Sequence, residues 1–179
     1  NLDGTLTDRA RAAGRVAQTI ARNAAEIRQC TPAPAEAAVL FNRLSSMVGG
    51  SQPSLSKLGN AGRDSLMGLH RAFFEEQIPV DFIHPEDIIQ DRLGQYKIVF
   101  LPFPVMLSKN VGEGVARYIE NGGTVVAEAR LAWNDERGFS SDRVPGFGLD
   151  KVFGAKEKLI RPVEKAKIFA APNAGLPGW

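Results

Sequence analysis

Residues 96–129 read YKIVFLPFPVMLSKNVGEGVARYIENGGTVVAEA. The stretch begins and ends with apolar runs, over 96–101 and 124–129, of the kind found in strands that are buried on both faces. Between them, residues 109–121 carry apolar side chains at helical spacing, at Val111, Val115 and Ile119. A strand, a helix and another strand at this spacing predict a crossover connection between parallel strands.

The same alternation extends toward the N-terminus. Apolar runs over 37–41 and 79–83 predict two further strands, and residues 63–76 predict a helix between them. Residues 45–60 are polar and rich in glycine and serine, which predicts a long loop. Short helices are expected over 86–90 and 145–153, and extra edge strands over 159–169. We therefore expect an α/β three-layer sandwich with a mostly parallel, flavodoxin-like sheet.

A long amphipathic helix is predicted ahead of the sheet, over residues 8–28. One face carries Ala13, Ala17, Ile20, Ala24 and Ile27, and the other carries Arg9, Arg11, Arg15, Arg22 and Arg28. The stretch Pro32-Ala33-Pro34 ends it as a stiff spacer. We expect residues 1–34 to lead from an upstream domain, 35–170 to form the domain itself, and 171–179 to be a C-terminal linker.

Composition excludes several classes of protein. The charge balance of 22 Lys and Arg against 20 Asp and Glu makes no case for nucleic-acid binding. No stretch approaches the length of a membrane span, so no membrane partner is expected. One cysteine and two histidines predict neither an internal disulfide nor a metal site. No cofactor is expected, and the absence of a visible targeting segment favours a cytoplasmic location.

Reactive side chains are scarce where a parallel sheet would place them. Ligands of such sheets bind beyond the carboxyl ends of the strands, and no Ser or Cys stands directly at a predicted strand exit. Cys30 lies at a helix end, and only His84 occupies a strand exit suited to chemistry. The neighbouring carboxylates Asp135 and Glu136 follow the last strand, where an ion pair with Arg130 or Arg137, or an intersubunit contact, is expected rather than catalysis.

Several motifs, taken in order, resemble the beta-galactosidase trimerisation domain of family 42 glycoside hydrolases. Arg71–Ile83 is similar to the family's helix and following "GIPVDFV" segment, and Tyr96–Pro102 to its "YKLVVAP". Val115–Val126 is similar to "LRAYVEAGGTLVV", and Ala129-Arg130 with Asp135-Glu136 resembles the family's arginine and "KDE" loop. Upstream, Asp3-Gly4-Thr5 and Arg9–Gly14 resemble the last helix leading out of the family's catalytic barrel.

The resemblance implies a class I glutamine amidotransferase-like fold without the catalytic cysteine. It also implies that the two catalytic glutamates lie in a barrel upstream of this chain, and that the domain holds three subunits together beside a neighbour's active site. The expected partners are therefore two further copies of the protein and the upstream barrel. The chain itself is expected to be no enzyme, whereas its parent is expected to be a beta-galactosidase-like glycoside hydrolase. A sugar-binding module or a hydrolase in its own right is the alternative.

A cyclic trimer needs apolar or aromatic anchors outside the core. The predicted anchors at strand exits and in loops are Phe103, Val105, Met106, Leu131, Trp133 and Phe139. With the polar residues Arg130, Asp135 and Glu136, they make the loop after the last strand the predicted subunit contact, centred on Trp133.

Overall fold

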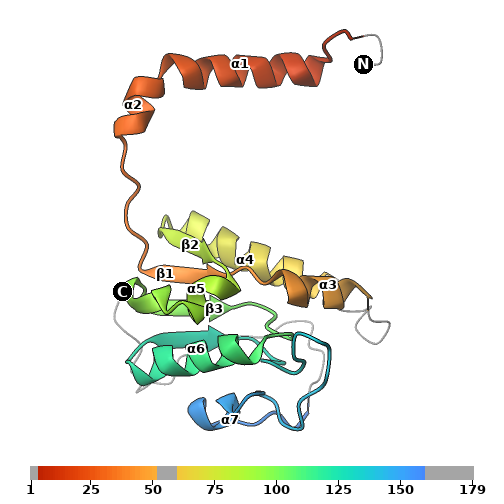
Figure 1. The fold of residues 1–179 in the computed structure, drawn as a ribbon. Helices are drawn as coiled ribbons and strands as arrows, with labels where there is room; N and C mark the ends of the chain where they lie inside the picture. The colour runs from red at the N-terminus through yellow and green to blue at the C-terminus, as the bar shows by residue number, and fades with distance from the viewer. Residues whose placement is uncertain (1–3, 52–59, 160–179) are drawn as a thin grey trace.

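A computed structural model describes residues 4–51 and 60–159, and these form a four-stranded parallel sheet. The strands are β1 (Ala37–Leu40), β2 (Val80–Ile83), β3 (Ile98–Leu101) and β4 (Thr124–Ala127), in the order β2-β1-β3-β4 (Figure 1). The chain adds β2 on one side of β1 and then β3 and β4 on its other side, as in doubly wound sheets. The predicted parallel sheet within a three-layer α/β sandwich is confirmed.

Helices cover both faces of the sheet. Helix α4 (Ala61–Glu75) lies on one face, where Phe73 packs edge-on against Phe100 with ring centroids 5.5 Å apart. On the other face lie α5 (Pro85–Ile89), α6 (Lys109–Glu120) and α7 (Leu149–Val152). A 3-10 turn over Arg92–Gln95 leads into β3.

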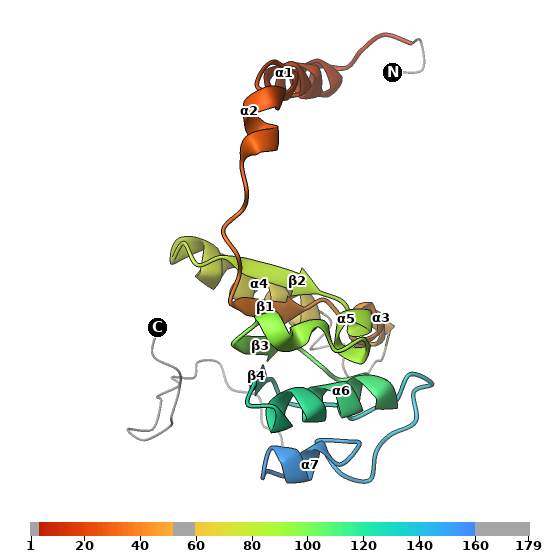
Figure 2. The same ribbon diagram turned by 60° about the vertical axis from the view of Figure 1, so that its left-hand side comes forward.

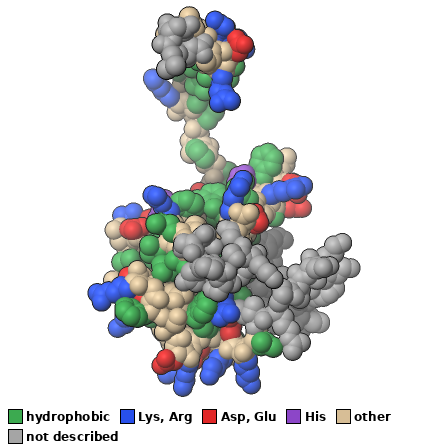
Figure 3. All heavy atoms as spheres, turned by 90° about the vertical axis from the view of Figure 1, so that its right-hand side faces the viewer, with side chains coloured by type: hydrophobic (Ala, Val, Ile, Leu, Met, Phe, Trp, Pro, Cys, Tyr) green, Lys and Arg blue, Asp and Glu red, His purple; other side chains and the backbone are tan. Residues whose placement is uncertain are grey.

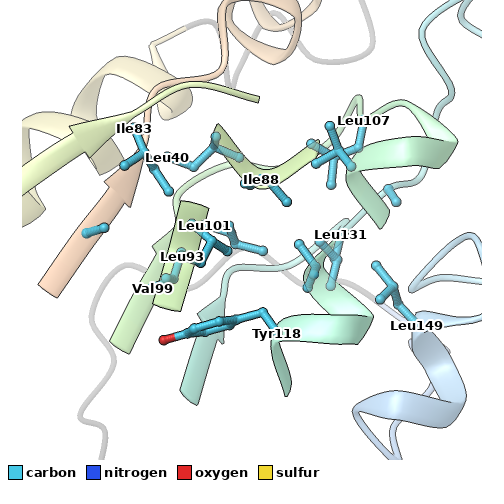
Figure 4. Packing of buried hydrophobic residues seen from close by; sticks show 14 of the residues in the cluster. Leu40, Ile83, Ile88, Leu93, Val99, Leu101, Leu107, Tyr118, Leu131 and Leu149 are labelled. Carbon is cyan, nitrogen blue, oxygen red and sulfur yellow. The ribbon is translucent and has the colours of Figure 1, made fainter. Parts of the chain in front are cut away.

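The larger part of the core lies between the sheet and α6. Side chains from β1, β3, α5 and α6 interdigitate there, and Leu131 and Leu149 extend the cluster beyond the ends of the strands (Figure 4). The inward residues of α6 include Val111, Val115 and Tyr118, and two of these match the predicted helical spacing. The Tyr118 hydroxyl donates to the backbone carbonyl of Tyr96 at 2.8 Å, so burial leaves no unpaired hydroxyl.

The N-terminal helices stand apart from this body. The predicted single helix is two: α1 (Asp8–Arg22) and α2 (Ala24–Gln29), which meet at Asn23. The Asn23 amide donates to the Thr19 carbonyl at 2.9 Å, a side-chain bond that competes with a continuous helix. Neither helix buries a residue, and an extended segment joins them to β1 (Figures 1 and 2).

Two further local predictions differ from the structure, and a third is not tested. Residues 45–60 were expected to form a loop, but α3 (Arg43–Ser51) is helical, because the Asn42 side chain accepts from the Leu44 N–H at 3.1 Å and starts the helix. The helix expected over 145–153 is shortened to α7, since Phe147 and Gly148 have φ of 54° and 78° and interrupt it. The edge strands expected over 159–169 fall, apart from Leu159, outside the described residues.

Candidate interaction surface at the carboxyl edge of the sheet

The segment after β4 is held firmly against the segment after β3. The Asn134 N–H donates to the Val105 carbonyl at 2.9 Å, and the Leu107 N–H donates to the Asn134 carbonyl at 3.0 Å. The Ala132 N–H donates to the Pro104 carbonyl at 2.8 Å. We call residues 130–143 the edge loop; its first part is therefore paired like a short extension of the sheet.

Asp135 organises the exposed tip of the edge loop. One oxygen of its carboxylate accepts the N–H groups of Arg137 at 2.9 Å and of Phe139 at 2.8 Å, closing a tight turn. The predicted ion pair between Asp135 or Glu136 and Arg130 or Arg137 is not formed among the described residues. Backbone amides satisfy Asp135 instead, and Glu136 is exposed. The turn presents the Phe139 ring to solvent with 71% of its surface accessible.

Arg130 and Trp133 are half-buried at the start of the edge loop. The Arg130 guanidinium lies 4.2 Å from the centroid of the Trp133 ring, which fits a cation–π contact. Arg130 has a φ of 69°, and its N–H donates to the Glu157 carboxylate at 2.6 Å. The second carboxylate oxygen of Glu157 is buried and lacks a hydrogen-bond partner in the part of the chain that is described. The residues 130–133 therefore hold a defined geometry at a cost in backbone strain.

Several predicted anchors lie in the core instead. Phe103 and Met106 are 8% and 7% exposed, and Val105 and Leu131 are nearly inaccessible, so the prediction that they lie outside the core is wrong. The edge loop pairs with residues 104–107 and lies beside the Met106 side chain, whereas the Phe103 ring packs against Gly62 of α4. Trp133 and Phe139 keep accessible surface.

The crevice where sheets of this type bind cofactors is filled. Between the ends of β1 and β3, the Asn42 amide and the Ser45 hydroxyl donate to the Met106 carbonyl at 2.7 and 3.1 Å. Phe103, two residues after β3, has a strained φ of 43°, but its side chain is a phenyl ring without a nucleophilic atom. A cavity of about 10 Å³ remains, which is the space of about one water molecule.

The remaining reactive residues do not converge on a site. The exposed His84 ring lies edge-on to Phe41, with ring centroids 5.7 Å apart. The backbone N–H of His84 donates to the Asp87 carboxylate at 2.9 Å. Cys30 is exposed at the end of α2. Across residues 4–51 and 60–159, no group of three or more His, Cys, Asp or Glu is arranged to hold a metal ion. None of the described helices has the length and apolar character that crossing a membrane requires.

The chain is similar to proteins of known family. The family model described as "Beta-galactosidase trimerisation domain" matches residues 35–174. The chain belongs to the beta-galactosidase trimerisation domain family. A curated relative, "Beta-galactosidase LacZ" of Heyndrickxia coagulans, is 36% identical over 105 residues, which are 58% of this chain and 15% of the relative.

Solved structures agree with this assignment to the trimerisation domain family. A beta-galactosidase from Bifidobacterium adolescentis superposes with a TM-score of 0.58 at 25% identity, over 69% of this chain and 56% of that one. A catalytic mutant of Gan42B, a GH42 beta-galactosidase from G. stearothermophilus, gives a TM-score of 0.55 at 25% identity, over 63% of this chain and 16% of that one. The chain thus spans well under two thirds of the length of each of these relatives.

The trimerisation-domain body carries one exposed feature that the sequence patterns did not single out. Phe74 follows the buried Phe73 on α4 and is 75% exposed. Adjacent residues of a helix point about 100° apart, so both phenylalanines could not face the sheet. The adjacent Phe73 and Phe74 are therefore the feature of the sequence that could have predicted a second apolar surface.

Proposed function

We propose that this chain holds three copies of a larger glycoside hydrolase together and carries no reactive centre of its own. The observation that carries the proposal is the match of the trimerisation family model to residues 35–174, nearly the whole described body. The filled crevice between β1 and β3 supports a scaffold rather than a catalyst, since Asn42, Ser45 and Met106 use their polar groups on one another.

The edge loop is the proposed contact with a neighbouring subunit. Trp133 and Phe139 are the aromatic anchors, and Arg130, Asp135 and Glu136 supply the polar surroundings. Figure 3 looks onto this edge and shows hydrophobic side chains at the surface among charged side chains of both signs. Such mixed surfaces with a few aromatic anchors are typical of subunit interfaces.

Residues 1–34 are the proposed connection to an upstream catalytic domain. Helices α1 and α2 expose Val16, Ile20 and Ile27 by half or more, and a helix that buries no apolar stripe in its own body needs a cover elsewhere. The chain's coverage of only 15% and 16% of two beta-galactosidase relatives supports such a domain.

Light scattering tests the trimer directly. We expect a mass of three times the 19.4 kDa of the chain at micromolar concentration, and a chain that stays at 19.4 kDa at every concentration contradicts the proposal.

Replacement of Trp133 tests the contact. Trp133→Ala is expected to weaken association by about 2 kcal/mol, or roughly thirtyfold, as aromatic anchors do. Ile89→Ala on α5, which truncates another exposed apolar residue, is the matched control and should leave the mass unchanged. An unchanged mass for Trp133→Ala at matched concentration would remove the edge loop from the interface.

A further inference from the structure

An exposed apolar surface runs along α4 and the edge strand β2. It consists of Met67, His70, Phe74 and Phe82, and we call it the aromatic stripe. Met67, Phe74 and Phe82 are 53%, 75% and 43% exposed. The His70 ring stacks on Phe74 at 6.2 Å and lies 5.9 Å from Phe82, so the rings form one continuous surface.

The aromatic stripe lies on the side of the body opposite to the edge loop. Strand β2 is one edge of the sheet, and β4, which leads into the edge loop, is the other. Figure 2 shows α4 and β2 on the upper side of the body, with the loop between β4 and α7 on the lower side. The body therefore has two separate exposed aromatic features, one around Phe74 and one at Phe139.

A closed ring of three identical subunits requires such a pair of surfaces. Each interface of a cyclic trimer joins one surface of a subunit to a different surface of the next. The edge loop supplies one of these surfaces under the proposed function, on which this inference rests. We infer that the aromatic stripe is the other surface, and that it receives the Phe139 turn of a second copy.

Charge complementarity supports this pairing. Arg137 is exposed two residues before Phe139, and its guanidinium has no ion pair within the described residues. Glu76 is exposed two residues after Phe74 and likewise has no ion pair in the described part of the chain. Docking Phe139 on Phe74 would bring the two unpaired charges of opposite sign to the rim of one contact.

Crosslinking between two different single-cysteine chains tests the pairing. In a Cys30→Ser background, which removes the single cysteine, one chain carries Arg71→Cys, beside the aromatic stripe on α4, and the other carries Ser140→Cys. Both substitutions leave Phe74 and Phe139 in place. The two chains carry tags of different size and are treated with a short bis-maleimide, alone and mixed.

We expect a product containing one chain of each kind, at a yield at least about tenfold above that of either chain alone. Glu113→Cys on α6, half exposed and on the opposite face of the sheet from α4, replaces Arg71→Cys as the matched control and should give no such product. Circular dichroism confirms that each variant is folded, and light scattering gives the mass of each mixture before treatment.

The mass separates failure of the pairing from failure of the trimer. A trimeric mass without the mixed product overturns the pairing and leaves the trimer standing. A product of two Arg71→Cys chains alone also overturns it, because that contact is two-fold. A monomeric mass at every concentration overturns the trimer and the pairing together.

Discussion

Two glycines inside helices differ in the free space that surrounds them. A Cβ on Gly114 of α6 would lie 2.7 Å from both the carbonyl oxygen and a methyl carbon of Ile88, whereas a Cβ on Gly68 of α4 would meet nothing within 4 Å. We expect Gly114→Ala to destabilise the fold by about 1–3 kcal/mol, because α5 must move away. Gly68→Ala should instead stabilise it by about 0.5–1 kcal/mol.

Urea unfolding of the two variants against the parent chain measures both effects. Each variant is the control for the other, since both add one methyl group to a helix interior. Equal shifts of the midpoint in the same direction would contradict the close contact between α5 and α6.

Tyr118 makes stability depend on pH in the alkaline range. Burial raises the pKa of Tyr118 above its ordinary value, and burial with the Asp81 hydrogen bond does the same to the pKa of Tyr96. A tyrosine with a raised pKa binds its proton more tightly when folded. Its contribution is therefore complete below the unfolded pKa of about 10 and is lost as the pH rises through the folded pKa.

The Tyr118→Phe variant separates this titration from other alkaline effects. It loses the hydrogen bond to the Tyr96 carbonyl, which costs about 1 kcal/mol at neutral pH. Its unfolding free energy should then fall less steeply than that of the parent chain above pH 10, because one raised pKa is gone. Urea titrations at a series of alkaline pH values measure the slope, and parallel slopes would contradict the assignment.

At the scale of elements, the edge loop depends on one carboxylate. Asp135→Ala removes the acceptor of two backbone N–H groups, which should loosen the turn by about 1 kcal/mol and speed hydrogen exchange at Arg137 and Phe139. Glu136→Ala is the matched control, since this neighbouring carboxylate accepts no hydrogen bond within the described residues. Similar exchange in both variants would show that Asp135 does not hold the turn.

Elements with local signals could be predicted from the sequence, and those made by distant pairing could not. The spacing of Val111 and Val115 predicts α6, and the apolar runs predict β1 and β3, because each pattern lies within one element. The burial of Met106 depends on the edge loop pairing with residues 104–107, a contact between segments almost thirty residues apart, and that of Phe103 depends on its packing against Gly62 of α4. No periodic pattern within either segment of the sequence indicates these contacts. Helix α3 is the exception, because its start signal at Asn42 is local, but the glycines, serines and proline that follow favour a loop and outweighed it.

At the scale of the whole molecule, the trimerisation body and the N-terminal helices are separate in structure. No residue of α1 or α2 is buried, and within residues 4–51 and 60–159 no hydrogen bond or ion pair joins these helices to the body. The first residues that contact the body are Ala35, which packs on the core, and Glu36, whose carbonyl accepts the Lys97 N–H at 2.7 Å. The body should therefore fold without residues 1–34.

Deleting residues 1–34 is thus expected to change the unfolding free energy of the body by less than about 0.5 kcal/mol, or its Tm by about 1–2 °C. The matched control begins the chain at Ala38 instead, which removes the Ala35 packing, the Glu36 hydrogen bond and the first residue of β1. That shorter chain should lose several degrees, because a central strand has been cut. Calorimetry of the three chains gives the comparison, and a large loss on removing 1–34 alone would mean that α1 and α2 belong to this body and not to an upstream domain.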